Sequence, residues 1–161
     1  MNISKNAAIE SFTNTDTIES KSCSGIFTAG ANIKTLINKG NIISEGDNNL
    51  HAGVKLNEGT IESIINTGTI RGNNFGFAVS IGKFGKFSMQ DGAIVIGKYS
   101  GIIAGNNQTL GELEISGANT RISGDDYGIW LNRGTKTEKV TVKDGARSKV
   151  ALLVFLIMVE R

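Results

Sequence analysis

The sequence contains no proline, one cysteine and one histidine among its 161 residues, and aromatic residues make up only 6% of it. The single cysteine, Cys23, excludes an internal disulfide and leaves no second thiol to share a metal ion. The 17 basic and 15 acidic residues are interspersed, so no block of positive charge indicates nucleic-acid binding. The apolar run from Val150 to Val159 is shorter than the roughly 20 residues that span a bilayer.

An internal repeat is the main feature that the sequence does have. Residues 61–70 match residues 9–18 at seven of ten positions, and a third copy lies between them at residues 33–42. The three copies therefore follow one another at steps of 24 and 28 residues. Self-similarity at such a period is typical of stacked, solenoid architectures.

A second repeated feature is a glycine followed by one to three apolar residues. It recurs at steps of 28, 23, 25 and 27 residues, with the glycines at Gly25, Gly53, Gly76, Gly101 and Gly128. Helical repeats of similar length would not tolerate this density of Gly, Asn and Thr, since each interior Gly costs a helix about 1 kcal/mol relative to Ala. Propeller blades need about 40 residues or more. Apolar residues at every second position in the later repeats instead predict short strands with one face inward.

These observations predict an all-β fold, a right-handed single-stranded parallel β-helix of about six rungs of roughly 26 residues, with three short strands in each rung. We assign residues 1–149 to this repeat domain. Residues 150–161 form an apolar tail, interpreted either as an irregular last strand or as sequence produced by a truncation or a change of frame. Cys23 is expected to be a small buried or half-buried thiol.

Several polar and glycine positions are predicted to be structural. Asparagine tolerates left-handed backbone angles, and its amide can hydrogen-bond the same residue one rung away. We therefore interpret the recurring asparagines and the glycines that follow them as a turn ladder: Asn14, Asn38, Asn66, Gly40 and Gly68. The glycines that precede the apolar strands are interpreted as corners that require special backbone geometry or close packing.

The repeats resemble the passenger domains of bacterial autotransporters, the type V secreted proteins. The resemblance rests on Ile61-x-x-Ile-Ile-Asn66-Thr-Gly68-Thr-Ile70-x-Gly72, with Phe75-Gly76-Phe77 shortly after, and on the counterparts that begin at Ile9 and Ile33. It implies a secreted or outer-membrane-associated β-helix, exported through a C-terminal membrane barrel in a longer parent protein. It also implies a non-catalytic scaffold that displays loops for adhesion or self-association, with a host-cell surface, a glycan or another copy as partner. No export signal precedes the repeats and no barrel strands follow them, so we expect the chain to be a fragment.

The alternative is a β-helix that binds or cleaves polysaccharide. Residues 14–16 and 124–126 resemble parts of the polygalacturonase motif, whose paired carboxylates protonate the leaving group and activate water. Asp16 and Asp125 are 109 residues apart, however, which is about four rungs and about 19 Å along the axis. Asp91 and Asp144 are about 10 Å apart at one turn position, but Asp before Gly is an ordinary turn residue.

We therefore predict no catalytic residue, no cofactor and no metal ligand. His51, the only histidine, is interpreted as a solvated loop residue. The candidates for glycan binding are Trp130 and Tyr127, which flank Gly128, together with Asp125 and Asp126. Trp130 has a second interpretation, as a side chain that caps a ladder or packs beside one.

Overall fold

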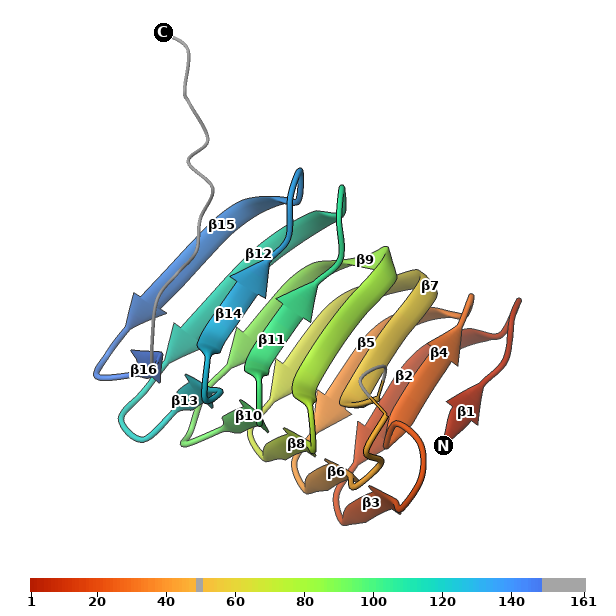
Figure 1. Cartoon of the computed structure of the whole chain (residues 1–161), viewed down its shortest axis with the longest axis horizontal. Helices are drawn as coiled ribbons and strands as arrows, with labels where there is room; N and C mark the ends of the chain where they lie inside the picture. Colours follow the sequence, from red (N-terminus) through yellow and green to blue (C-terminus); the bar gives the residue numbers. More distant parts are fainter. Residues whose placement is uncertain (49–50, 149–161) are drawn as a thin grey trace, which may run out of the picture.

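The computed structural model describes residues 1–48 and 51–148, and all regular structure within them is β-strand. The strands stack in parallel as a β-solenoid of about six turns of roughly 26 residues, which confirms the predicted fold class. Figure 1 shows the turns following one another along the long axis, with the N-terminus at one end. No helix able to cross a membrane occurs in the described part of the chain. The predicted apolar tail lies outside the described residues.

Each rung contributes strands to three columns. The first column contains β2 (Ala8–Asn14), β5 (Asn32–Asn38), β7 (Ala52–Asn66), β9 (Phe75–Met89), β12 (Thr109–Ser116) and β15 (Lys136–Lys143). The second column contains β3 (Thr17–Ser20), β6 (Asn41–Ser44), β8 (Thr69–Gly72), β10 (Ile94–Gly97), β13 (Arg121–Ser123) and β16 (Arg147–Ser148). The third contains β1 (Asn2–Ile3), β4 (Ile26–Ala29), the first halves of β7 and β9, β11 (Ser100–Ala104) and β14 (Tyr127–Leu131).

Two strands are longer than the sequence predicted. β7 and β9 each run for 15 residues, from the third column of one rung into the first column of the next. In β7 the chain turns at Glu58 and Gly59, which have φ of 67° and 81°. The register with β9 shifts at the same place, between Leu56 and Thr60. A bulge of this kind bends a strand without ending it, so the expected corner between two short strands becomes a bend within one.

The interior is built from columns of apolar side chains in register. One column runs through all six rungs, and its members are Phe12, Leu36, Ile64, Phe87, Leu113 and Val140. The facing column of the second set of strands contains Ile18, Ile42, Ile70, Val95 and Ile122.

Asn14, Asn38 and Asn66 form a buried amide ladder. Asn14 Nδ2 donates a hydrogen bond of 2.8 Å to Oδ1 of Asn38, and Asn38 Nδ2 donates one of 2.8 Å to Oδ1 of Asn66. None of the three adopts a positive φ, which is found instead at the turn residues Asp91 and Asp144, at 56° and 55°. The left-handed geometry is therefore a property of other turns, and these asparagines act through their side chains.

The recurring glycines permit close approach between neighbouring rungs. A Cβ on Gly53 would lie 2.8 Å from the carbonyl oxygen of Gly76 and 2.8 Å from Cγ2 of Ile70. A Cβ on Gly68 would overlap the carbonyl oxygen of Gly40. The same crowding by a neighbouring rung or the facing column holds for Gly25, Gly40, Gly76 and Gly101. None of these glycines, nor Gly128, has a positive φ. Of the two explanations that the sequence left open, close packing is the one that applies.

Candidate functional site

The outer face of the third column carries a row of side chains, one from each of five successive strands. The register pairs each member with the next, in the order Phe27, Lys55, Ala78, Ile103 and Trp130. The strands that bear them, β4, β7, β9, β11 and β14, lie side by side in Figure 1. The residues on either side of each member are directed into the core, so the row faces outward. We call these five residues the outer row.

The aromatic residues of the described chain divide between the interior and this outer face. Inside, Phe77, Phe84 and Phe87 pack together with ring centroids 5.0 to 6.1 Å apart. Outside, two further aromatic pairs join the outer row. Their centroid separations are 5.0 Å for Tyr127 with Trp130 and 6.3 Å for Phe75 with Tyr99. The outer face is thus unusually rich in aromatic side chains for a chain with so few.

Two hollows meet at Lys55. One, of about 550 Å³, is lined by residues that include Ser24, Phe27, His51 and Lys55. The other, of about 200 Å³, is lined by Lys55, Phe75, Ala78, Val79, Ser80, Ile103 and Gly105. Ala78 and Gly105 have small side chains or none, which leaves the second hollow open. Lys55 lines both hollows.

Lys55 is a partly buried cation on an apolar surface. Its Nζ lies 5.9 Å from the ring centroid of Phe27. Within residues 1–48 and 51–148 no carboxylate oxygen comes within ion-pair distance of it. Burial lowers the pKa of Lys55, because the charged form loses solvation. Lys55 is therefore a partly desolvated cation with no counter-ion among the described residues.

The four glycan-binding candidates from the sequence lie together at one end of the outer row. Tyr127 and Trp130 are in contact and half-buried. Asp125 and Asp126 are exposed in the preceding loop, which is held by hydrogen bonds from their backbone N–H groups to the carbonyl oxygens of Lys98 and Tyr99 at 2.6 and 3.2 Å. Trp130 is in register with Ile103 on the outer face of β14.

The sequence analysis missed the remainder of the outer row. A signal was present, since every member stands two residues after one of the recurring corner glycines. That position is apolar, aromatic or Lys in the five rungs. The alternation of strand faces would have placed all five on one surface once the register was known.

A second depression, the axial groove, lies on the outside of the first column. It has a volume of about 750 Å³ and crosses the six first-column strands, and its lining includes Glu10, Lys34, Glu62, Gly85 and Glu138. Ile33 pairs in register with Ile9 on one side and with Ile61 on the other. The residues that follow them, Glu10, Lys34 and Glu62, therefore lie on three successive rungs with Lys34 in the middle. Lys34 Nζ is 3.0 Å from Oε2 of Glu10. Its pKa is raised, first by that hydrogen bond and last by the charge of Glu62.

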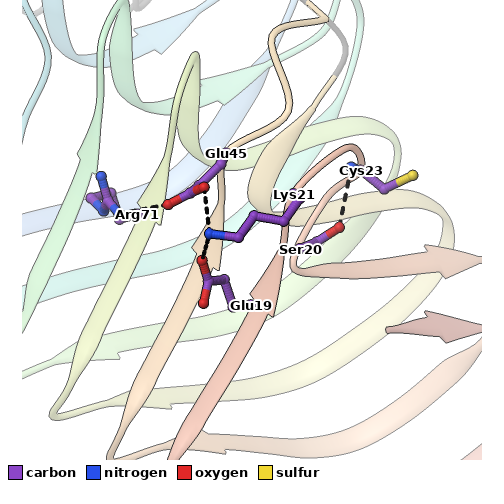
Figure 2. A network of polar contacts seen from close by, with 6 residues as sticks. All are labelled: Glu19, Ser20, Lys21, Cys23, Glu45 and Arg71. Carbon is purple, nitrogen blue, oxygen red and sulfur yellow. Dashed lines mark hydrogen bonds and ion pairs between the residues drawn. The ribbon is translucent and has the colours of Figure 1, made fainter.

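Other acidic residues of the surface are also held by lysine. Figure 2 shows Lys21 between Glu19 and Glu45, with Nζ 2.8 Å from Oε2 of Glu45, and Arg71 on the far side of Glu45 at 4.0 Å. The hydrogen bond from Lys21 is the main reason why the pKa of Glu45 is lowered. Cys23 points away from this network and is exposed. The expectation of a buried or half-buried thiol was wrong, because Cys23 stands in the loop after β3 and not in an interior column.

A second network crosses the later rungs. Oε2 of Glu114 is 2.9 Å from Nζ of Lys86, and Oε1 is 2.8 Å from Nζ of Lys143. Hydrogen bonds from these two lysines lower the pKa of Glu114 to about 2. Glu112 lies 3.9 Å from the same Lys86 Nζ. Here too, neighbouring carboxylates are bridged by ammonium groups.

His51 is not the fully solvated loop residue that the sequence suggested. Its side chain is half-buried at the edge of the larger hollow, and its Nδ1 is buried with no hydrogen-bond partner among the described residues. Nδ1 lies against Gly46, where a Cβ would be 2.5 Å from it. Within the described chain, no three His, Cys, Asp or Glu side chains are grouped so that they could hold a metal ion.

Comparison with protein-family models, curated proteins and solved structures finds no match. Family membership therefore gives no information on the function of either surface.

Proposed function

We propose that this chain is a non-catalytic scaffold segment of an autotransporter-like surface protein. In this proposal the stacked rungs hold loops and outer faces at a cell surface, for adhesion or self-association. The parent protein would supply the C-terminal outer-membrane barrel and the export signal. The repeat structure supports the proposal, because each rung buries its apolar face only against its neighbours.

The observation that carries the proposal is the pairing of neighbouring carboxylates with lysine. A general acid needs a carboxyl whose pKa is raised towards the working pH. The pKa values of Glu45 and Glu114 are shifted the opposite way by Lys21, Lys86 and Lys143. Both side chains are therefore ionised at neutral pH and suited to holding rungs together.

Surface display tests this proposal. The full chain would be placed between an export signal and an outer-membrane barrel in a Gram-negative host. We expect the chain to reach the cell surface in a folded form, so that added protease leaves a resistant core. We also expect more cell clumping or attachment than with the barrel alone. Retention inside the cell, or display without any gain in clumping or attachment, would contradict the proposal.

A second candidate function, polysaccharide cleavage, is favoured by the axial groove. Two rung spacings place Glu10 and Glu62 about 10 Å apart, close to the separation of about 6.5–9.5 Å at which inverting glycosidases hold their two carboxyl groups. Lys34, however, lies between them and is paired with Glu10.

Release of reducing ends from a panel of acidic and neutral polysaccharides separates this candidate from the scaffold. Activity that is lost in both Glu10→Gln and Glu62→Gln, and kept in Glu138→Gln at the far end of the groove, would establish cleavage. The scaffold proposal predicts no turnover by the unmodified chain.

A further inference from the structure

We propose that the outer row binds an acidic polysaccharide that lies along the solenoid axis. A sugar carboxylate would be held at Lys55, and neighbouring sugar rings would lie against the aromatic side chains on either side. This site goes beyond the scaffold function, and it requires neither surface display nor the axial groove.

The charge of Lys55 selects an anionic group. A cation on an apolar surface loses solvation, and an ion pair or hydrogen-bonded anion offsets that cost. Exposed lysines keep their hydration whether they are paired with a glutamate, as Lys21 and Lys34 are, or not, as Lys39 is. Lys55 instead has the ring of Phe27 at 5.9 Å and an open hollow on each side. An incoming carboxylate is the partner that this arrangement lacks.

The flanking side chains favour a ligand made of rings. Phe27 lies on one side of Lys55, and Phe75 borders the hollow on the other. Tyr127 and Trp130 then form a pair at the far end of the row. Aromatic faces carry negative charge and attract the polarised C–H groups that sugar rings present on one face, while sugar hydroxyls stay in contact with water. Aromatic side chains that alternate with hollows along the row could each contact one ring of a chain of sugars.

The length and direction of the row favour a polymer over a single sugar. From Phe27 to Trp130 the row spans four rung spacings, about 19 Å at about 4.8 Å each. A peptide that binds as an added strand needs a free strand edge. β7, β9 and β11 are each paired on both sides, so the centre of this face presents side chains and no free edge.

The distribution of charge argues against a nucleic acid as the ligand. A nucleic acid carries a phosphate at every nucleotide, and its binding sites follow the backbone with repeated positive charge. The outer row has one lysine, and Asp125 and Asp126 stand exposed beside its Tyr127 end. The charges therefore fit a glycan in which acidic sugars alternate with neutral ones, with the carboxylate near Lys55 and neutral hydroxyl groups near the two aspartates.

The test uses a hyaluronan hexasaccharide, in which acidic and neutral sugars alternate, and its carboxyl methyl ester, which has the same rings without the charge. Trp130 is the only tryptophan of the sequence, so its fluorescence reports occupancy of the row directly. Calorimetry gives the affinity independently. We expect the acid to bind at least about tenfold more tightly than the ester, as a charge-assisted hydrogen bond allows.

Variants separate the parts of the site, with circular dichroism used to check that each is folded. Lys55→Met keeps most of the side-chain volume and should remove the preference for the acid while leaving the affinity for the ester unchanged. Lys39→Met, at an exposed turn between the first two columns, is the matched control and should bind like the unmodified chain. Ala78→Leu fills the second hollow and should weaken both ligands by about tenfold.

Four results would overturn the proposal. The first two are equal affinity for the acid and the ester, and equal affinities of Lys55→Met and Lys39→Met for both ligands. The third is tighter binding of a single-stranded oligonucleotide of matched length than of the hexasaccharide. The fourth is the absence of both a heat signal and a fluorescence change at millimolar hexasaccharide. These measurements use the purified chain, so their outcome is independent of the surface-display experiment. Glycan binding can be absent when display succeeds, and it can be present when display fails.

Discussion

The first three rungs and the last three solve the same structural problem differently. In both halves the chain must turn from the first column of strands into the second. In the first three rungs the turn begins at Asn14, Asn38 or Asn66 and reaches the next interior residue four positions later. From Met89 to Val95 the same path takes six positions. The longer turns contain a residue with positive φ, such as Asp91 or Asp144.

The difference shows which interactions determine each type of turn. The short turns are held by contacts between rungs, because the amides of Asn14 and Asn38 bond the next rung and Gly40 and Gly68 each admit a carbonyl from a neighbouring rung. The longer turns are set by their own backbone angles. Asn66 stands at the junction, where the next residue in register is Met89 and where Nδ2 of Asn66 has no hydrogen-bond partner among the described residues.

The largest expected effect separates the two uses of glycine. Gly68→Ala should destabilise the fold by about 3 kcal/mol or more, because its Cβ would overlap the Gly40 carbonyl oxygen in a packed stack. Gly92→Ala should cost about 1 kcal/mol, because Gly92 has φ of 80° but nothing within 4 Å of a new Cβ. Urea unfolding would measure both.

Asparagine substitutions at the same two positions sharpen this comparison. Asn tolerates the left-handed region, so Gly92→Asn should recover most of the loss. Gly68→Asn should recover none. Equal losses for the two alanine variants would refute the distinction between spacing and backbone angle.

Removal of the central amide should have the next largest effect. Asn38→Ala leaves Oδ1 of Asn66 without its donor and Nδ2 of Asn14 without one of its acceptors. At roughly 1–3 kcal/mol for each buried group left unpaired, we expect a loss of roughly 2–4 kcal/mol. Asn14→Ala, at the end of the ladder, should cost less. Thermal and chemical unfolding of both variants provides the measurement, and a smaller loss for Asn38→Ala than for Asn14→Ala would contradict the ladder.

Extension of the ladder across the junction gives a smaller, comparative effect. Met89→Asn loses apolar packing but supplies an acceptor for the unpaired Nδ2 of Asn66. Ile115→Asn loses similar packing, and its neighbour in register, Met89, offers no amide. We expect Met89→Asn to be the more stable of the two by about 1–3 kcal/mol. Equal stability would show that the unpaired amide has no cost.

The smallest effect on stability is expected from the surface network of the later rungs. The hydrogen bonds from Lys143 and Lys86 lower the pKa of Glu114 from 4.5 to about 2. The contribution is therefore present above about pH 4.5, where the carboxyl group is ionised in both the folded and the unfolded chain. It is lost as the pH falls through about 2.

A carbon NMR titration checks this assignment. In the unmodified chain the Glu114 carboxyl should titrate at about 2. In the Lys86→Met, Lys143→Met double variant the pKa should move back towards 4.5, whereas Lys139→Met should leave it unchanged. An ordinary pKa in the unmodified chain would show that the ion pairs do not persist in solution.

The fold class followed from the sequence because its determinants repeat. The seven matching positions of the first and third copies include the inward Ile9 and Ile61 and the ladder residues Asn14 and Asn66, whose roles depend on register alone. The long strands were not predictable, since Glu58 and Gly59 look like any other polar turn. The register of Val95 was equally inaccessible, because the Asp91 turn adds residues that the earlier rungs lack.

The candidate site was only partly accessible from sequence. Trp130, Tyr127, Asp125 and Asp126 are neighbours along the chain, so their proximity needed no structure. Phe27, Lys55 and Ile103 come from different rungs, and only parallel register brings them onto one face. The missing counter-ion of Lys55 is a property of three-dimensional surroundings, which no local sequence pattern reports.

The most direct test of the account is an NMR measurement of contacts between side-chain amides. The central claim is that equivalent residues of successive rungs stack, as Asn14 does on Asn38 and Asn38 on Asn66, at separations of 24 and 28 residues. The account predicts nuclear Overhauser effects between the amides of both pairs and slow solvent exchange for the donors Asn14 and Asn38. Rapid exchange at all three side chains, with no contact between either pair, would contradict it.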